Sequence, residues 1–389
     1  MSQKPRLLIV SGSFPEIRCG VSGHVKIIAE GAAQAGEYEV RVLTSDDPAV
    51  DTRIARGYTV YPRIRQWRAT KACLICREIL SQSPDVVHIQ NPTVKYSGLR
   101  SCTMSAVGPL LKTLAPKVRL VVMQHDIAIS DPLFRWRYYP LFAAADAVVV
   151  SNSRDEQAVR AQGISRSKIY RAPVSSHISL HRAGAEQKKR SRQALGIPND
   201  SVCAVHFGFI HPERNVDVIL RAMACLRKDI PGIYGLILGD AFPGAKVYAE
   251  QCRTLAKRLG LAERVTWTGF ASPEQIADGL AAADVFVNLP QRGADLRNTS
   301  ILSGILAHLP VVTTRNRRYY TDAELESLGC YCVRPRDPRA LADAIRSCIS
   351  SPPAAEELAR RAAVLEPVKI WKKHIEVNHR AYRGETTSA

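Results

Sequence analysis

Short runs of apolar, often β-branched residues alternate with helical segments along this chain, and the alternation runs through the sequence twice. The predicted strands are residues 6–11, 38–44, 59–62, 85–90, 118–124 and 147–151 in the first half, and 202–209, 233–240, 264–270, 283–289 and 310–314 in the second. Strands that alternate with helices form βαβ units, which build parallel sheets covered by helices on both faces. The sequence therefore predicts an α/β protein with two doubly wound, Rossmann-like domains.

The rhythm breaks once, between Pro173 and about Arg192, where PVSSHISL precedes the charged segment AEQKKRSR. A chain of 389 residues is also too long for a single hydrophobic core. We therefore predict a first domain over residues 1–180 and a second over residues 193–367, joined by a linker. Ligands of open parallel sheets bind beyond the carboxyl ends of the strands, so we expect the site in a cleft between the two sheets.

The formal net charge is +18, which indicates anionic partners. Basic and aromatic residues are interleaved in two places: in the segment Phe134–Tyr139, and in a first cluster made of Arg63, Arg65, Trp67 and Arg68. Such clusters suit an anionic membrane surface, and they also suit single-stranded nucleic acid. The plain alternative is a solvated basic face with partly buried rings. Because the chain carries no nucleic-acid motif, we predict no nucleic-acid partner.

No apolar stretch reaches the length that spans a bilayer, and the run Leu7–Val10 is shorter than a signal-peptide core. The ten cysteines lack the paired spacing of a zinc site, and we interpret Cys73 and Cys76 as core residues of a helix. These features predict a cytoplasmic protein with no cofactor and no metal. It would be peripheral on the inner membrane face if the basic clusters bind lipid.

Loops at predicted strand ends of the second half carry side chains that suit an anion. Gly208 ends a strand and Arg214 begins the next helix, where a guanidinium can bind phosphate. Asp295 and Arg297 precede a helix that starts with Asn298, Thr299 and Ser300. A helix start with hydroxyls and an arginine favours an anion, whereas the aspartate suits neutral hydroxyls. A diphosphate joined to a sugar fits both requirements.

The sequence resembles the retaining glycosyltransferases of the GT-B fold, in the large family that includes sucrose synthases and mannosyltransferases. The segments GFIHPERNVDVIL, VTWTGFASPEQIADGLAAADVFVNLP and DLRNTSILSGILAHLPVV carry the resemblance in the second half. In the first half, SGSFPEIRCGVSGHV resembles the family's glycine loop, and VVMQHDI resembles its strand that ends in a His-Asp pair. The last helix, within residues 368–389, resembles the segment that packs back onto the first domain.

The resemblance implies transfer of a sugar from a nucleotide-diphosphate sugar to an acceptor hydroxyl, with the anomeric configuration retained. It implies that His125 lies beside the reacting sugar and that Asp295 contacts the sugar hydroxyls, so we predict these two residues as catalytic. The predicted donor-binding residues are Gly20, Gly208, Arg214, Gly269, Phe270, Arg297, Asn298, Thr299, Ser300 and Ser303. His88, in the strand DVVHIQ, is interpreted as a structural histidine with its hydrogen bonds satisfied.

Three positions depart from the family's pattern. Ser303 stands where a second acid usually clamps the ribose, Phe209 stands where an arginine often follows Gly208, and His308 replaces a glycine. The alternative to an active enzyme is therefore a GT-B relative without activity that acts as a binding or partner subunit. Both basic clusters fall in the half that binds acceptor in this fold, which favours a saccharide or lipid-linked acceptor, as in polysaccharide or cell-envelope glycan synthesis.

Overall fold

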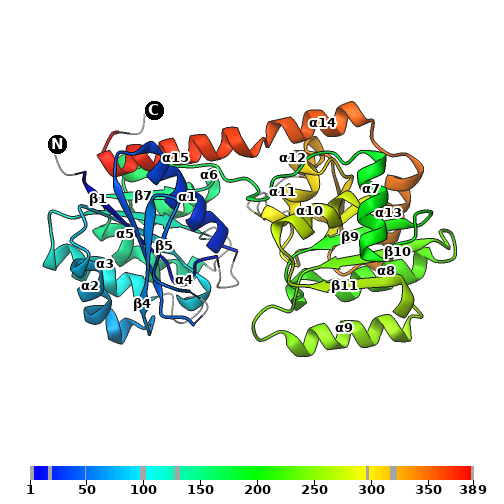
Figure 1. Ribbon diagram of the computed structural model, residues 1–389, viewed down its shortest axis with the longest axis horizontal. Coiled ribbons are helices and arrows are strands. Elements are labelled where there is room, and N and C mark those ends of the chain that lie inside the picture. Colours follow the sequence, from blue (N-terminus) through cyan, green and yellow to red (C-terminus); the bar gives the residue numbers. More distant parts are fainter. Residues whose placement is uncertain are drawn as a thin grey trace. The chain divides into compact units, whose positions relative to one another are not determined.

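The computed structural model describes residues 4–15, 20–48, 50–96, 102–125, 127, 132–294, 298–315 and 322–386. The chain divides into two compact units (Figure 1). The first unit contains Met1–His177 together with Val368–Ala389, and the second contains Ile178–Pro367. Each unit has its own sheet and its own hydrophobic core.

The first unit is built on an eight-stranded sheet with the order β3-β4-β2-β1-β5-β6-β7-β8. Every neighbouring pair is parallel except β3 and β4. The central strands consist of buried apolar residues almost throughout, as expected for strands covered on both faces. The strands are β1 (Arg6–Val10), β2 (Glu39–Ser45), β3 (Arg53–Ala55), β4 (Tyr58–Ile64), β5 (Val86–Asn91), β6 (Arg119–Gln124), β7 (Ala147–Val150) and β8 (Ile169–Arg171).

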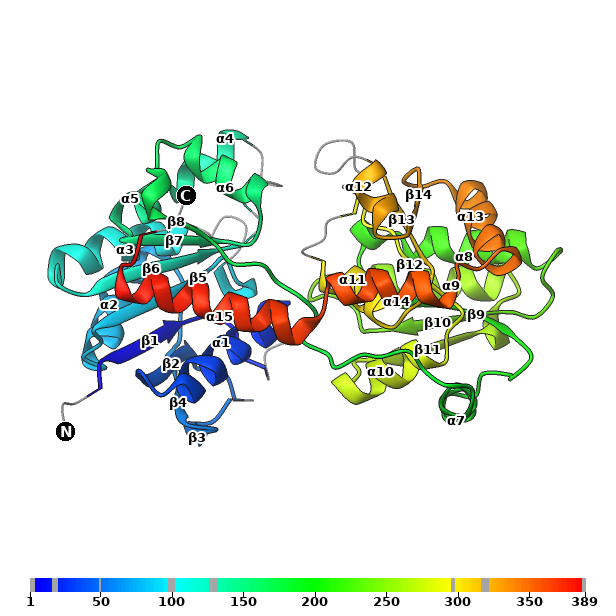
Figure 2. The ribbon, with the colours of Figure 1, turned by 90° about the horizontal axis from the view of Figure 1, so that it is seen from above.

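The helices of the first unit lie on both faces of this sheet. Helix α15 (Pro367–Arg383), from the far end of the sequence, lies beside α1 (Ser22–Ala35), and Ala381 and Tyr382 of α15 belong to the same core as α1 (Figures 1 and 2). Helix α3 (Thr103–Leu114) packs against both α2 (Ala72–Ser81) and α5 (Tyr139–Ala144). The remaining helices are α4 (Pro132–Arg135) and α6 (Ser153–Arg160).

The second unit contains a six-stranded parallel sheet with the order β11-β10-β9-β12-β13-β14. From β9 the chain moves outward through β10 and β11, and it then crosses to β12 on the other side of β9. The strand order therefore reverses between β9 and β12, which is the place where ligands bind in such sheets. The strands are β9 (Val202–Phe207), β10 (Ile233–Leu238), β11 (Val265–Gly269), β12 (Val285–Asn288), β13 (Val311–Thr314) and β14 (Cys330–Val333).

Helices cover both faces of this second sheet and bury two apolar clusters. Their starts follow the usual capping chemistry: the Ser272 hydroxyl and the Gln275 side chain form a capping box at α10, and Asp337 accepts from the Ala340 amide at α13. The helices are α7 (Ala185–Leu195), α8 (Val216–Leu226), α9 (Lys246–Arg258), α10 (Pro273–Ala281), α11 (Thr299–Leu306), α12 (Asp322–Ser327), α13 (Pro338–Ser350) and α14 (Ala355–Val364).

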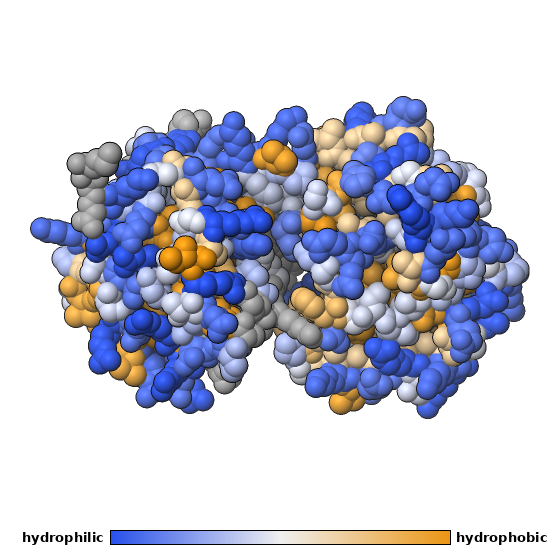
Figure 3. All heavy atoms as spheres, viewed as in Figure 1, coloured by the Kyte–Doolittle hydropathy of each residue, from blue (hydrophilic) through white to orange (hydrophobic). Residues whose placement is uncertain are grey.

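The prediction of two Rossmann-like, parallel-sheet domains is confirmed. One side-chain prediction is wrong, because only Cys76 is buried and Cys73 is exposed. The buried stripe of α2 runs through Ala72, Ile75, Cys76 and Ile79, and Cys73 lies beside this stripe, toward solvent. Among the described residues, no helix combines the length and the apolar composition needed to cross a membrane. The face shown in Figure 3 is mostly hydrophilic, with apolar residues in small scattered groups.

Candidate functional site

Three neighbouring strands of the second unit end in glycines at the same edge of the sheet. Gly208 follows β9, Gly239 follows β10, and Gly269 ends β11, with φ angles of 142°, 140° and 68°. Other residues rarely adopt such positive φ angles. A Cβ atom built on Gly239 would lie 2.1 Å from the carbonyl oxygen of Gly208, so only glycine allows the two backbone segments to pass this closely.

Beside these glycines, β9 and β12 pair only through Val285–Ala204 and Phe286–Val205. Beyond these pairs, side-chain hydrogen bonds connect the two strand ends. The amide nitrogen of Asn288 donates to the Phe207 carbonyl at 3.0 Å. Further out, the amide nitrogen of Asn215 donates to the Leu289 carbonyl at 2.8 Å. Amide side chains thus bridge the carboxyl ends of β9 and β12.

His206 lies near the carboxyl end of β9, where its side chain is fully buried. Its Nδ1–H donates to the Val287 carbonyl at 3.1 Å, and its Nε2 has no hydrogen-bond partner among the described residues. Burial lowers the pKa of His206 to about 4, the bond to Val287 acts in the opposite direction, and the charge of Arg214 lowers the pKa further. A neutral imidazole therefore faces the strand ends at neutral pH.

The start of α11 adds polar groups to the same edge. Asn298 caps this helix by accepting from the Ser300 amide at 3.1 Å, and its own amide nitrogen lies 3.4 Å from the Asn288 side-chain oxygen. A Cβ atom on Gly208 would lie 3.4 Å from the Ser300 hydroxyl and 3.8 Å from the Asn288 amide nitrogen. The structure thus brings Gly208, Asn298 and Ser300 together at a helix N-terminus, a place that favours anions.

Arg214 ends the short helix Pro212–Arg214 after β9, and its charge lowers the pKa of His206. The position after Gly208 carries no cation. Phe209 packs edge to face against Phe242, with 5.5 Å between ring centroids. An aromatic pair therefore stands where the resembling family often places an arginine.

The other predicted donor-binding residues lie in different surroundings. Phe270 is exposed directly after Gly269. Thr299 is half-buried at the first turn of α11. Ser303 is fully buried, and its hydroxyl donates to the Thr299 carbonyl at 2.7 Å, so in this conformation it faces its own helix. The predicted residues Asp295 and Arg297 lie outside the described residues.

In the first unit, His125 follows β6 directly and is half-buried. Its backbone is held on both sides: its N–H donates to the Asn91 carbonyl at 2.7 Å, and its carbonyl accepts from the Gln124 side chain at 2.8 Å. Its ring nitrogen Nε2 lies 3.0 Å from Oε1 of Gln90. The predicted residue His125 therefore has a backbone held by two hydrogen bonds and a ring nitrogen in contact with Gln90.

Three more rings surround His125 or its neighbours. His24, near the start of α1, stacks edge to face on His125, Trp371 and His374, with centroid distances of 5.1, 5.3 and 4.7 Å. Burial holds the pKa of His24 well below its ordinary value and lowers that of His374 to about 4. Gly20 is exposed before α1, and a Cβ atom there would contact nothing within 4 Å.

The first basic–aromatic cluster differs from the prediction. Trp67 is 5 % exposed, its ring nitrogen donates to the Ser45 hydroxyl at 2.8 Å, and its ring packs on Tyr96. A ring that is bonded inside the core cannot insert into a membrane, so its assignment to a membrane-facing surface is wrong. Arg65 pairs with Asp46 at 3.1 Å.

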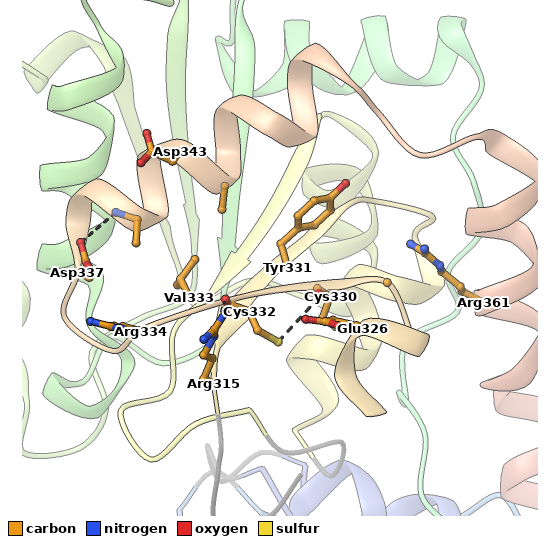
Figure 4. A pocket seen from close by; sticks show the side chains of 13 residues that line it. Arg315, Glu326, Cys330, Tyr331, Cys332, Val333, Arg334, Asp337, Asp343 and Arg361 are labelled. Carbon is orange, nitrogen blue, oxygen red and sulfur yellow. Dashed lines mark hydrogen bonds between the residues drawn. The ribbon is translucent and has the colours of Figure 1, made fainter. Parts of the chain in front are cut away.

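A separate cavity of about 770 Å³ lies against the edge strand β14 and contains none of the predicted site residues (Figure 4). Three arginines and three acids line it together, so its charges largely cancel: Arg315, Arg334, Arg361, Glu326, Asp337 and Asp343.

Three residues at these strand ends, His206, Asn288 and Gln90, and one residue of helix α15, Tyr382, were not predicted as site residues from the sequence. His206 and Gln90 stand inside apolar strand sequences, VCAVHF and VVHIQN. A polar residue at the penultimate or last position of a buried strand is the signal that could have identified them, because a buried polar group needs a partner or a ligand. His88 is confirmed as a satisfied histidine, bonded at both ring nitrogens.

Comparison with known proteins matches both halves of the chain to families. Residues 187–364 match the family "Glycosyl transferases group 1", and residues 20–174 match "Glycosyl transferase 4-like domain". A D-inositol 3-phosphate glycosyltransferase of Streptomyces avermitilis is 27% identical over 237 residues, which are 57% of this chain and 48% of that protein. The alpha-D-kanosaminyltransferase of Streptomyces kanamyceticus is 27% identical over 244 residues, 62% of this chain and 61% of that protein.

The chain thus spans about half of the first relative's length. Among solved structures, Anabaena HepE in complex with UDP and glucose superposes with a TM-score of 0.75 at 18% identity, covering 96% of this chain and 99% of that one. Sucrose-phosphate synthase from Thermosynechococcus elongatus superposes with a TM-score of 0.74 at 17% identity, covering 98% of each chain. These similarities establish the same fold.

Proposed function

Because this chain belongs to the group 1 glycosyltransferases and has the GT-B fold, we propose that it transfers a sugar from a nucleotide-diphosphate sugar to an acceptor hydroxyl with retention of configuration. The observation that supports this proposal best is the carboxyl edge of the second sheet. There the Gly208 and Gly239 backbones pass closely beside the capped start of α11, at the point where strand order reverses.

The leaving diphosphate is the group that this edge suits. The positive end of the α11 dipole and the guanidinium of Arg214 both favour an anion, and they need not reorganise as negative charge grows on the leaving oxygen. Ser300 supplies a hydroxyl next to Gly208, which itself carries no side chain. We assign His125 a hydrogen bond to the donor sugar and Asp295 contacts to its outer hydroxyls, as the resemblance implies.

Uridine diphosphate is the donor nucleotide that we propose. Anabaena HepE is described in complex with UDP and with UDP-glucose, and it shares the fold of this chain over nearly its full length. The acceptor would be a hydroxyl of a small polar molecule or of a saccharide, because one relative is named for glycosyl transfer to D-inositol 3-phosphate. The role of Phe270, exposed beside Gly269, would be contact with the base.

The test of the donor site is a titration of UDP by calorimetry. The Arg214→Ala variant should bind UDP about 10- to 100-fold more weakly, the loss expected for one charge-assisted hydrogen bond. Arg221→Ala removes an exposed arginine from α8 in the same unit and is the matched control. Equal UDP affinity of both variants and the wild type would overturn the assigned diphosphate site.

The test of transfer uses UDP-glucose and D-inositol 3-phosphate as first substrates, with release of UDP and formation of a glycoside as separate readouts. Retention is read from the anomeric coupling constant of the product in NMR. Release of UDP with an unchanged acceptor would indicate hydrolysis, and a product of inverted configuration would overturn the retaining mechanism.

Membrane association is proposed for the second basic–aromatic cluster. Phe134 and Trp136 are each 59 % exposed, and Tyr139 is exposed next to them. Arg137 lies 5.8 Å from the Phe134 ring centre, so cationic and aromatic groups share this surface. Aromatic rings with nearby arginines suit the headgroup region of an anionic bilayer. A lipid-linked or cell-envelope acceptor would then be reached from the inner face of the membrane.

Co-sedimentation with phosphatidylglycerol vesicles tests this surface. The double variant Phe134→Ser/Trp136→Ser should lose binding about tenfold, since two exposed rings no longer insert. Reversal of Arg63, Arg65 and Arg68 to glutamate is the companion variant. If only that reversal weakens binding, the contact is electrostatic and lies elsewhere; if neither variant changes it, the membrane proposal fails.

A second candidate function is a binding or partner subunit without transferase activity. The Phe209–Phe242 pair in place of a cation and the inward-facing Ser303 favour it, because both remove contacts that the family makes to the donor. Tight UDP-glucose binding without transfer or hydrolysis, for every acceptor tried, would support this function.

A further inference from the structure

The imidazole of His206 carries one ring nitrogen that the described residues leave without a hydrogen bond. His206 is the penultimate residue of β9, and its side chain is fully buried. Nδ1 lies 3.1 Å from the Val287 carbonyl oxygen, whereas Nε2 has no partner among the described residues. Because a buried polar atom without a partner costs free energy, this nitrogen indicates a place where a further polar group binds.

Three polar atoms border the space beside Gly208, where any other residue would carry a Cβ atom. A Cβ atom built there would lie 3.4 Å from the Ser300 hydroxyl oxygen, 3.8 Å from the Asn288 amide nitrogen and 3.9 Å from Nε2 of His206. The partnerless nitrogen thus faces the glycine at the carboxyl edge of the sheet, next to the start of α11. The absent side chain of Gly208 leaves a small space with polar groups around it.

The Val287 carbonyl fixes which end of the His206 ring donates. A carbonyl oxygen can only accept, so Nδ1 must carry a proton. Burial lowers the pKa of His206 to about 4, so at neutral pH the ring is neutral and Nε2 is bare. A bare imidazole nitrogen accepts a hydrogen bond, and it repels the unprotonated oxygens of a diphosphate. The group that occupies this space must therefore bring a hydrogen atom of its own.

The two neighbouring atoms suit a hydroxyl group as well. The amide nitrogen of Asn288 donates one hydrogen to the Phe207 carbonyl at 3.0 Å and carries a second one. The Ser300 hydroxyl can donate or accept. A ligand hydroxyl can donate to Nε2 and accept from Asn288 or Ser300 at the same time, whereas a phosphate oxygen can only accept. The local chemistry therefore selects a hydroxyl for this space.

We propose that His206 is a specificity-determining residue of the donor site, whose Nε2 accepts a hydrogen bond from a hydroxyl of the bound nucleotide sugar. This hydroxyl belongs either to the ribose or to the transferred sugar. The assignment to the donor rests on the proposed function, whereas the bare state of Nε2 does not. Two requirements then meet at one edge of the sheet: the positive end of α11 favours the diphosphate, and His206 favours a neutral hydroxyl beside it.

Two substitutions separate the two ends of the ring. His206→Asn can keep a donor to the Val287 carbonyl, but its side chain ends short of the Nε2 position. His206→Gln can reach the Nε2 position with an amide oxygen, which accepts, but it gives up the bond to Val287. The matched control is His308→Asn, which removes an imidazole just after the other end of α11, at a positive φ of 57° that asparagine tolerates.

The first experiment compares the affinities for UDP-glucose and for UDP by calorimetry. His206→Asn should bind UDP-glucose about 2- to 10-fold more weakly than the wild type, the loss expected for one hydrogen bond, and His206→Gln should recover part of it. A ribose hydroxyl predicts the same loss for UDP, whereas a hydroxyl of the transferred sugar predicts unchanged UDP affinity. His308→Asn should bind both ligands like the wild type. If His206→Asn also does so, the proposal is overturned.

The second experiment locates the proton and the hydrogen bond directly. In protein labelled with ¹⁵N-histidine, NMR distinguishes protonated from bare ring nitrogens, and His206→Asn identifies the signals of His206. We expect a proton on Nδ1 and a bare Nε2 whose signal shifts when UDP-glucose binds. A ring that served only as a bridge to Val287 would show no such shift. A proton on Nε2 at pH 7.5, or an Nε2 signal that neither UDP nor UDP-glucose moves, would contradict the proposal.

Proton uptake provides the opposing outcome. If His206 instead became an imidazolium that donates to a phosphate, binding of UDP-glucose would take up a proton, and calorimetry in two buffers of different ionisation enthalpy would detect it. Uptake that His206→Asn abolishes would therefore refute the hydroxyl acceptor. If UDP-glucose does not bind the wild type at all, the proposed donor fails. The NMR spectrum of the free protein then still decides the acceptor, which a bare Nε2 supports and a protonated Nε2 excludes.

Discussion

The sharpest test of the donor site is the substitution Gly239→Ala. The φ angle of Gly239 is 140°, which costs an alanine about 1–3 kcal/mol. The new Cβ atom would also lie 2.1 Å from the Gly208 carbonyl oxygen, and backbone cannot move aside as a flexible side chain can. Overpacking of this kind costs about 1–3 kcal/mol more. We expect a loss of about 2–6 kcal/mol in the free energy of unfolding of the second unit.

Gly196→Ala separates the two contributions. Gly196 also has a positive φ, 66°, but a Cβ atom there would meet nothing within 4 Å, so only the backbone cost of about 1 kcal/mol applies. Both variants are unfolded in urea, and the transition that added UDP shifts reports on the second unit. Gly239→Ala should also displace Gly208 and weaken UDP binding. If it is as stable as Gly196→Ala and binds UDP like the wild type, the close passage of the two backbones is refuted.

Three further predictions concern stability. Burial lowers the pKa of His374 to about 4, so the neutral form of this residue contributes to stability. This contribution is fully present above the unfolded pKa of about 6.5 and is lost as the pH falls toward 4. Relative to His374→Gln, the wild type should lose about 2 kcal/mol of unfolding free energy between pH 7.5 and pH 5 in urea titrations. Asp284→Asn should destabilise the second unit by about 2–4 kcal/mol, since the nearly buried Arg192 loses its partner at 2.7 Å, and Asp284→Glu should recover part of the loss. Gly31→Leu on α1 should displace α15 and raise hydrogen exchange of its amides, because even a Cβ atom at Gly31 would lie 2.2 Å from Ile375. Unchanged exchange in α15 would contradict this packing.

The architecture could be predicted from the sequence wherever apolar periodicity was strong. Helix α13 begins at Pro338 and ends at Ser350, and the sequence marks it with the cap Asp337, the proline and an apolar stripe. The strands β3 and β8 were missed, since each has only three residues and neither forms an apolar run long enough to recognise. Trp67 shows a different failure: its charged neighbours suggested a surface, but its position against Tyr96 depends on contacts distant in sequence.

The candidate site could be predicted in part, for a physical reason. Glycines after strands and a capped helix start leave local signals, so the sequence predicts Gly208, Asn298 and Ser300, which the structure brings together. Gln90 left only a weaker signal, a polar residue near the end of a buried strand, and Tyr382 left none, because its contact with His88 joins parts of the chain that are far apart in sequence. The prediction for Ser303 did not anticipate that its hydroxyl would bond within its own helix.

The position of α15 has a consequence for biosynthesis. The core of the first unit includes Tyr382 and Ala381, so the part of its sheet beside α1 that α15 covers stays exposed until the ribosome has made the intervening residues 178–367. At ~5–20 residues per second this delay lasts about 10–40 s. During this interval the nascent chain presents apolar strands and unbonded imidazole groups to chaperones, while the second unit, contiguous in sequence, can already fold.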